Sequence, residues 1–231
     1  MNEDLYEKPV IAAIKQKLTL AESSGISEFE CMGRLFNIHK NVFPPTHFQS
    51  TGIFTRHIPY VRNSSFLELG CGAGVTAITA ALEGCYPVVA SDISEEAVKN
   101  TLFNVTRHRV NNLISVRHGD LFDILKDGES FDIIFWNSNF LFVPENYTFK
   151  EEIYHAFYDP GYITHKRFLQ DARKYLNPQG KILIGFSSQG NEAAFSELLS
   201  EHGYNYVVLY EEKGKGENAQ IYKIFQLTSL I

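Results

Sequence analysis

The sequence is short of cysteine, of positive charge and of long apolar runs, and each shortage excludes a class of protein. Its three cysteines lie in no pattern typical of a disulfide framework or a zinc site, so we interpret them as reduced thiols in a cytoplasmic protein. With 21 Lys and Arg against 27 Asp and Glu, the net charge of -6 argues against general nucleic-acid binding. No apolar run approaches the roughly 20 residues of a membrane-spanning helix, and the N-terminus is acidic and polar, so we expect neither export nor membrane insertion.

Motifs typical of several other protein classes are also missing. The eight histidines show none of the spacings that bind metal ions, so we assign no metal site. No G-x-S-x-G turn is present, which removes support for a serine hydrolase. No internal repeat or low-complexity segment is evident, so nothing indicates a repeat architecture.

What the chain does contain is the pattern of one α/β domain. Its 231 residues, 44% of them hydrophobic, can bury a core of good size. After residue 64, apolar runs alternate with segments of helical spacing, which predicts a doubly wound, mostly parallel sheet. The last two runs are joined by the short, turn-rich KGKGEN segment and should form an antiparallel hairpin. The seven predicted strands are 65–70, 86–92, 113–120, 131–137, 181–188, 204–212 and 219–227.

The residues before this alternating pattern predict a separate extension. Segments 9–23 and 26–39 carry apolar residues at helical spacing, and no strand is evident there. We therefore divide the chain into a short N-terminal helical extension or cap, 1–60, and a main domain, 61–231. Because the extension comes just before a proline-containing segment and the first strand, we expect it to cover the binding site and to shape its pocket.

A glycine-rich loop follows the first predicted strand. Gly70, Gly72 and Gly74 permit positive φ angles and close approach of a ligand, and the helix after them offers unpaired N–H groups. The same stretch fits the dinucleotide pattern G-x-G-x-x-A through Gly72, Gly74 and Ala77, with Asp92 about 20 residues further on. The loop alone therefore leaves an NAD-binding oxidoreductase open.

Three carboxylates near predicted strand ends favour a cationic ligand over NAD. Glu68 lies two residues before Gly70, where a diphosphate would be repelled and a cation favoured. Asp92 and Asp120 follow the next two strands, at the edge where open α/β sheets bind ligands. A sulfonium nucleoside therefore fits this edge better than NAD does. Each acid also has a structural alternative, because Glu68 or Asp92 could cap the following helix and Asp120 could be a turn residue.

Four segments resemble class I S-adenosylmethionine (SAM) methyltransferases: ELGCGAG, VASDISEEAVKN, GDLFDIL and FDIIFWNSNF. Within that class, the second and third are most similar to HemK-like release-factor glutamine methyltransferases and their small N-methyltransferase relatives. The similarity runs from about Val42 to the C-terminus and implies a Rossmann-like methyltransferase fold with SAM as cofactor. It implies that the glycine loop wraps the methionine part, Asp92 binds the ribose, and Ile93, Asp120 and the Leu121 backbone contact the adenine. The residues that we assign to the cofactor are Thr51, Glu68, Gly70, Cys71, Gly72, Gly74, Asp92, Ile93, Asp120, Leu121 and Asn137.

The segment Asn137-Ser138-Asn139-Phe140 is similar to the acceptor motif of these N-methyltransferases, Asn-Pro-Pro-Tyr/Phe. An Asn side-chain oxygen and a backbone carbonyl can accept N–H bonds from the acceptor and turn its nitrogen lone pair toward the methyl group. Phe140 would pack against a planar acceptor. We assign catalytic roles to Asn137, Ser138 and Phe140. Both prolines are absent here, so a plain loop and a SAM-binding module without activity remain alternatives.

The acceptor class follows from elimination. The 60 residues before the first strand do not resemble the helical substrate domain of the glutamine methyltransferase, and the acidic charge disfavours rRNA or DNA. We therefore expect N-methylation of a small molecule or a protein side chain, with rRNA or DNA bases as the alternative. The five aromatics of segment 147–161 predict either a lid over the acceptor or a helical face packed on the core through Phe149, Ile153 and Phe157.

Overall fold

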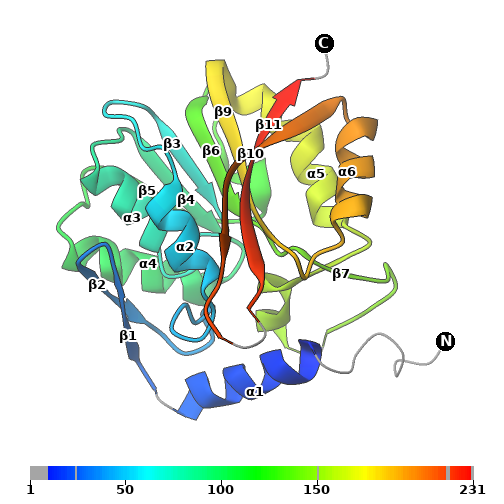
Figure 1. Cartoon of the computed structure of the whole chain (residues 1–231). Coiled ribbons are helices and arrows are strands. Elements are labelled where there is room, and N and C mark those ends of the chain that lie inside the picture. Colours follow the sequence, from blue (N-terminus) through cyan, green and yellow to red (C-terminus); the bar gives the residue numbers. More distant parts are fainter. Residues whose placement is uncertain (1–9, 24, 150, 217–218, 230–231) are drawn as a thin grey trace.

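The computed structural model describes residues 10–23, 25–149, 151–216 and 219–229, and its centre is a seven-stranded sheet (Figure 1). The strand order is β10-β11-β9-β6-β3-β4-β5, and only β11 runs against its neighbours. The predicted α/β sheet with a C-terminal antiparallel hairpin is therefore confirmed. The strands are β3 (Phe66–Leu69), β4 (Val88–Asp92), β5 (Ile114–His118), β6 (Phe131–Asn137), β9 (Leu176–Ser187), β10 (Tyr204–Lys213) and β11 (Ile221–Ser229).

Helices cover both faces of this sheet and enclose two hydrophobic cores (Figure 1). One face carries α2 (Ser50–His57), α3 (Val75–Leu82) and α4 (Glu95–Arg107). The other carries α5 (Ile163–Asp171) and α6 (Glu192–Glu201), with the 3-10 turns η1 (Leu121–Ile124) and η3 (Ala172–Tyr175). Because both faces are covered, the central strands are continuous apolar runs, and all four residues of β3 are buried.

The N-terminal extension is only partly helical. The helix α1 (Val10–Ser23) confirms the first predicted helix, but the second is wrong, because residues 26–39 form a hairpin of β1 (Ser27–Cys31) and β2 (Arg34–Ile38). Met32 and Gly33 turn the chain with φ angles of 52° and 71°, a conformation typical of two-residue hairpin turns. The spacing of the apolar residues had suggested a helix, although in β2 the buried side chains alternate.

Two buried asparagines of α4 attach this hairpin to the main body. Asn100 donates to the carbonyl of Asn37 (2.8 Å) and accepts from the N–H of His39 (2.9 Å). Asn104 accepts from the N–H of Asn37 (2.9 Å) and donates to the carbonyl of Ala73 (2.9 Å) in the glycine-rich loop. The hairpin is therefore connected, through one side chain, to the loop that precedes α3.

The segment after β6 forms a third, smaller hydrophobic cluster with α1. It contains β7 (Leu141–Val143), the 3-10 turn η2 (Glu152–Ala156) and β8 (Tyr158–Pro160), and the two strands pair in parallel. Ile14 and Leu18 of α1 pack against this segment. Phe157 is buried in the same cluster with Phe149 and Ile153 packed against it, as the packing alternative predicted, but the element is a short 3-10 turn and not an α-helix. In the described part of the chain, no helix is long and apolar enough to cross a bilayer.

Candidate active site

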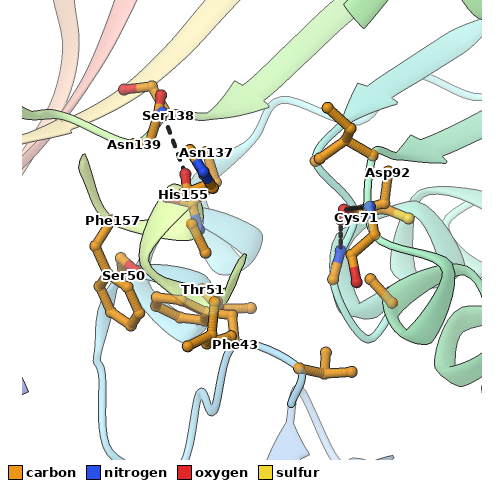
Figure 2. A pocket seen from close by; sticks show the side chains of 18 of the residues that line it. Phe43, Ser50, Thr51, Cys71, Asp92, Asn137, Ser138, Asn139, His155 and Phe157 are labelled. Carbon is orange, nitrogen blue, oxygen red and sulfur yellow. Dashed lines mark hydrogen bonds between the residues drawn. The ribbon is translucent and has the colours of Figure 1, made fainter. Parts of the chain in front are cut away.

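A cavity of about 800 Å³ lies at the edge where the parallel strands end. Figure 2 shows Cys71 and Asp92 on one side of it and Asn137, His155 and Phe157 on the other. Among the described residues, no three His, Cys, Asp or Glu side chains are grouped as metal ligands. The predicted site residues that line the cavity are Thr51, Glu68, Gly70, Cys71, Gly72, Asp92, Ile93, Asp120, Leu121, Asn137, Ser138 and Phe140.

Gly72 and Gly74 of the glycine-rich loop have different tasks. Both have positive φ, 55° and 77°. A Cβ at Gly72 would meet no atom within 4 Å, so the backbone there is open to a ligand. Gly74 does not line the cavity, and a Cβ there would lie 2.7 Å from Cγ2 of Thr101. The structure gives it a packing role, since it lets α3 and α4 approach each other, and its cofactor contact stays a prediction.

Asp92 connects the glycine-rich loop to the start of α4. Its Oδ2 accepts the N–H of Gly72 (2.8 Å), and its Oδ1 accepts the N–H of Ser94 (2.9 Å). Burial raises the pKa of Asp92, these two N–H bonds oppose the shift, and the carboxylate of Glu152 adds to it. Ser94 is the N-cap residue of α4, but its hydroxyl makes no capping bond. Asp92 therefore orders the backbone around the cavity while its remaining lone pairs can accept bonds from a ligand.

Glu68 is the one charged side chain of β3. It is 3% exposed, and its Oε2 accepts the N–H of Ala77 (2.7 Å) in the first turn of α3. Burial raises the pKa of Glu68 to about 8, although the bond from Ala77 opposes the shift. The structure thus shows the capping contact that was the alternative to cofactor binding, in a side chain that also lines the cavity.

We expect the Glu68→Gln variant to be less sensitive to pH than the wild type. The pKa of Glu68 is about 8 in the folded protein and near 4.5 otherwise, so between these values the folded state binds the extra proton. Wild-type stability should therefore fall as the pH rises from about 4.5 to about 8, by on the order of 5 kcal/mol, and then level off. Glutamine keeps the acceptor for Ala77 and cannot ionise. Urea unfolding from pH 5 to 8.5 checks this, and parallel curves for the two proteins would contradict it.

The predicted adenine contacts lie around a pair that the sequence did not reveal. Asp120, before η1, accepts a bond from Nη1 of Arg167 in α5 at 2.6 Å. The side chain of Ile93 is 55% exposed although it lines the cavity, as expected for an apolar surface that a ligand would cover. Leu121 begins η1 with a φ angle of 44°, which turns the chain beside Asp120. These residues form one end of the cavity.

Asn137 ends β6 at the other end of the cavity, and in the described structure no hydrogen bond occupies its side-chain amide. Ser138 differs, because it is 3% exposed and its hydroxyl donates to the carbonyl of Gly185 in β9 (2.8 Å). Asn139 donates to the carbonyls of Tyr158 (3.0 Å) and His155 (3.2 Å), the latter seen as a dashed line in Figure 2. Asn139 keeps a buried Oδ1 without a partner, whereas in Asn137 neither the oxygen nor the nitrogen of the amide is hydrogen-bonded in the described structure.

The bonds of Ser138 and Asn139 stand where the related motif has its two prolines. Proline fixes φ through its ring, whereas here side-chain bonds attach the backbone after β6 to β9 and β8. Phe140 adds a third attachment, because its carbonyl accepts the hydroxyl of Tyr162 (2.8 Å) and its ring lies 5.9 Å from that of Phe186. The segment is thus held on several sides without proline.

Sequence analysis expected the N-terminal extension to cover this site but did not identify which of its residues reach the cavity. Ala13, Ile14 and Lys17 of α1 line the cavity, and so does His155 of η2. The aromatic content of segment 147–161 indicated that it lies near the acceptor. No pattern indicated where α1 would pack, because the residues that share its buried cluster, such as Leu141 and Phe157, lie more than 120 positions away.

The known proteins that this chain is similar to are methyltransferases. The sequence profile of a family described as "Methyltransferase domain" matches residues 61–228. The chain is 30% identical over 161 residues to the bifunctional methyltransferase of Rickettsia felis, covering 64% of this chain and 29% of that protein. It is 35% identical over 127 residues to the release factor glutamine methyltransferase of Aquifex aeolicus, covering 53% and 43%. The chain therefore spans less than half the length of these curated relatives.

A solved structure supports the fold. The T. thermophilus 16S rRNA N2 G1207 methyltransferase, in complex with AdoMet and guanosine, superposes with a TM-score of 0.56. The match covers 88% of this chain and 50% of that chain. At 19% sequence identity this likeness shows the Rossmann-like fold alone.

Proposed function

Because the chain belongs to the methyltransferase domain family, we propose that it binds SAM and transfers the methyl group to a nitrogen atom of its acceptor. The observation that carries this proposal is the position of Asn137. Its unoccupied amide faces the same cavity as the glycine-rich loop and Asp92. A hydrogen-bonding group for the acceptor and a binding surface for a nucleoside thus share one space.

The residues at the end of the cavity near the glycine-rich loop fit SAM. Asp92 can accept bonds from ribose hydroxyls, and the open backbone at Gly72 lets the amino-acid part approach. Ile93 and Leu121 offer apolar surface for the adenine. The Asp92 carboxylate suits a cationic sulfonium and would repel a diphosphate, whereas Glu68, with its pKa raised to about 8, adds little negative charge at neutral pH. When bound, SAM supplies an electrophilic methyl group and a neutral leaving group.

The residues at the other end fit a nitrogen acceptor. The Oδ1 atom of Asn137 can accept an N–H bond and so orient the nitrogen lone pair. As the nitrogen becomes positive, the same dipole stabilises the charge, and this stabilisation needs no strong base. Ser138 and Asn139 hold this backbone in place through β9 and β8, so Asn137 does not have to reorganise during the reaction.

We expect calorimetry to show that the protein binds SAM and its demethylated product at least a hundredfold more tightly than NAD. The physical reason is the carboxylate of Asp92 beside Gly72, which disfavours a diphosphate at the loop. Tight NAD binding with indifference to SAM would contradict the proposal in favour of an oxidoreductase. SAM binding without methyl transfer to any fraction of the native cell extract would instead indicate a binding module.

A further inference from the structure

We propose that the acceptor is a small, flat and largely apolar molecule, either a heteroaromatic amine or an aromatic amide. It binds in the half of the cavity lined by Phe43, Phe48 and Phe157, which we call the aromatic half. This inference rests on the proposed nitrogen methylation and deepens it. It selects a small molecule over the protein side chain or nucleic-acid base that the same chemistry could modify.

Aromatic rings form the walls of this half of the cavity. Phe43, Phe48 and Phe157 line it and contact one another, with ring centroids 4.8 to 5.1 Å apart. Phe140 and Leu141 line it next to Asn137. Flat apolar molecules gain most from such walls, because stacked and tilted ring contacts add to the burial of apolar surface.

The polar groups lie at one edge of these walls. Figure 2 shows Asn137 and His155 above the rings of Phe157 and Phe43. No hydrogen bond occupies either polar side chain in the described structure. Lys17 lines the same half with its Nζ 4.8 Å from the ring centroid of Phe48. A molecule that fits this space has an apolar body and carries its reactive nitrogen at the edge near Asn137.

The helix α1 restricts access to this half. In Figure 1 it lies below the edge where the parallel strands end, and Ala13 and Ile14 contribute to the cavity wall. Ile14 and Leu18 are buried against Leu141 and Phe157, so α1 is part of a hydrophobic cluster. A folded protein or an RNA helix would have to displace these contacts to bring its nitrogen to Asn137, whereas a small molecule would not.

The volume of the cavity is large enough for two small ligands. Single ligand pockets range from about 300 to about 1,000 Å³. A cavity of about 800 Å³ therefore has room for the cofactor and for one compact acceptor.

The transfer to such an acceptor balances with the groups present. The nitrogen lone pair forms the new N–C bond, and the electron pair of the broken C–S bond stays on sulfur. The nitrogen then loses its proton to the imidazole of His155, which lines the same half of the cavity.

The first test uses SAM with a radiolabelled methyl group and an extract of the native cells, separated into low-mass, protein and nucleic-acid fractions. We expect labelled product in the low-mass fraction, unchanged by protease and nuclease. Label in the protein or nucleic-acid fraction would overturn this inference and leave nitrogen methylation standing. Label in no fraction, with SAM binding intact, would overturn the proposed function and this inference with it.

A matched pair of α1 variants tests the position of the acceptor. Both Ala12 and Ala13 are exposed, but only Ala13 lines the cavity. We expect Ala13→Trp to fill part of the aromatic half and to lower methyl transfer at least tenfold, with SAM affinity changed less than twofold. Ala12→Trp should behave as the wild type. Equal transfer by both variants would overturn the placement.

Binding of an aromatic probe gives a second readout, independent of activity. Saturation-transfer NMR with quinoline, in the presence of the demethylated cofactor, should give a signal for the wild type and for Ala12→Trp. Because tryptophan at position 13 occupies the aromatic half, we expect the signal to be lost in Ala13→Trp. Equal quinoline signals from the wild type and Ala13→Trp would overturn the inference.

Discussion

Replacing Asp92 by alanine is expected to weaken SAM binding by roughly a hundredfold or more. The ribose would lose two bonds to a charged acceptor, each contributing about 1.5 kcal/mol or more, and about 3 kcal/mol corresponds to a factor of roughly 150. The change also leaves the N–H groups of Gly72 and Ser94 without their partner. Calorimetric titration with SAM measures the effect.

Two further variants separate the causes of this loss. Asp92→Asn keeps the size of the side chain and one acceptor oxygen, so we expect an intermediate loss of affinity. Asp127→Ala removes an exposed carboxylate outside the cavity and should bind SAM as the wild type does. If Asp92→Ala bound SAM within threefold of the wild type while remaining folded, Asp92 would be a structural cap of α4 and no ribose contact.

The features that sequence analysis predicted well are those encoded by neighbouring residues. The order of β3, glycine loop and α3 follows from a buried apolar run, a group of glycines and a helical pattern within 20 residues. The same holds for the strand-end positions of Asp92 and Asp120. Because parallel strands end at one edge, these separate local patterns together placed most of the predicted site residues in one cavity.

The hairpin β1–β2 shows where local patterns are ambiguous. Its strands have five residues each, too few for alternation to be distinguished from helical spacing. The turn depends on Met32 at positive φ, a conformation that methionine gives no reason to expect. The hairpin is further held by Asn100 and Asn104 of α4, more than 60 residues away. Tertiary contacts therefore decide this element.

Beyond residues 137–140, most walls of the acceptor half could not be assigned from the sequence, for a related reason. Its walls come from α1, the segment before α2 and η2, which are distant in the sequence and meet only in the folded chain. Likewise, Arg167 gives no local sign that it pairs with Asp120. The residues at the glycine-loop end of the cavity can be identified from local motifs, whereas most of those in the acceptor half are identified only from the packing of the folded chain.

Asn137→Ala is expected to lower methyl transfer by about two to three orders of magnitude while changing SAM affinity less than twofold. Removing one preorganised polar group at a reacting centre costs on this scale, because no other group replaces it as charge develops. Ser138 and Asn139 make their own bonds to β9 and β8, so the backbone should stay in place and the cofactor end should be unaffected.

The measurement is transfer of radiolabelled methyl groups from SAM to the unfractionated native extract, beside calorimetry with SAM. Asn111→Ala is the matched control, because Asn111 is exposed and lies outside the cavity. Equal transfer by the Asn137→Ala variant and the wild type would show that residues 137–140 are a plain loop. Loss of SAM binding along with transfer would instead place Asn137 on the cofactor. Only loss of transfer with intact binding supports its role at the acceptor, because that role requires a contact made to the nitrogen and not to the nucleoside.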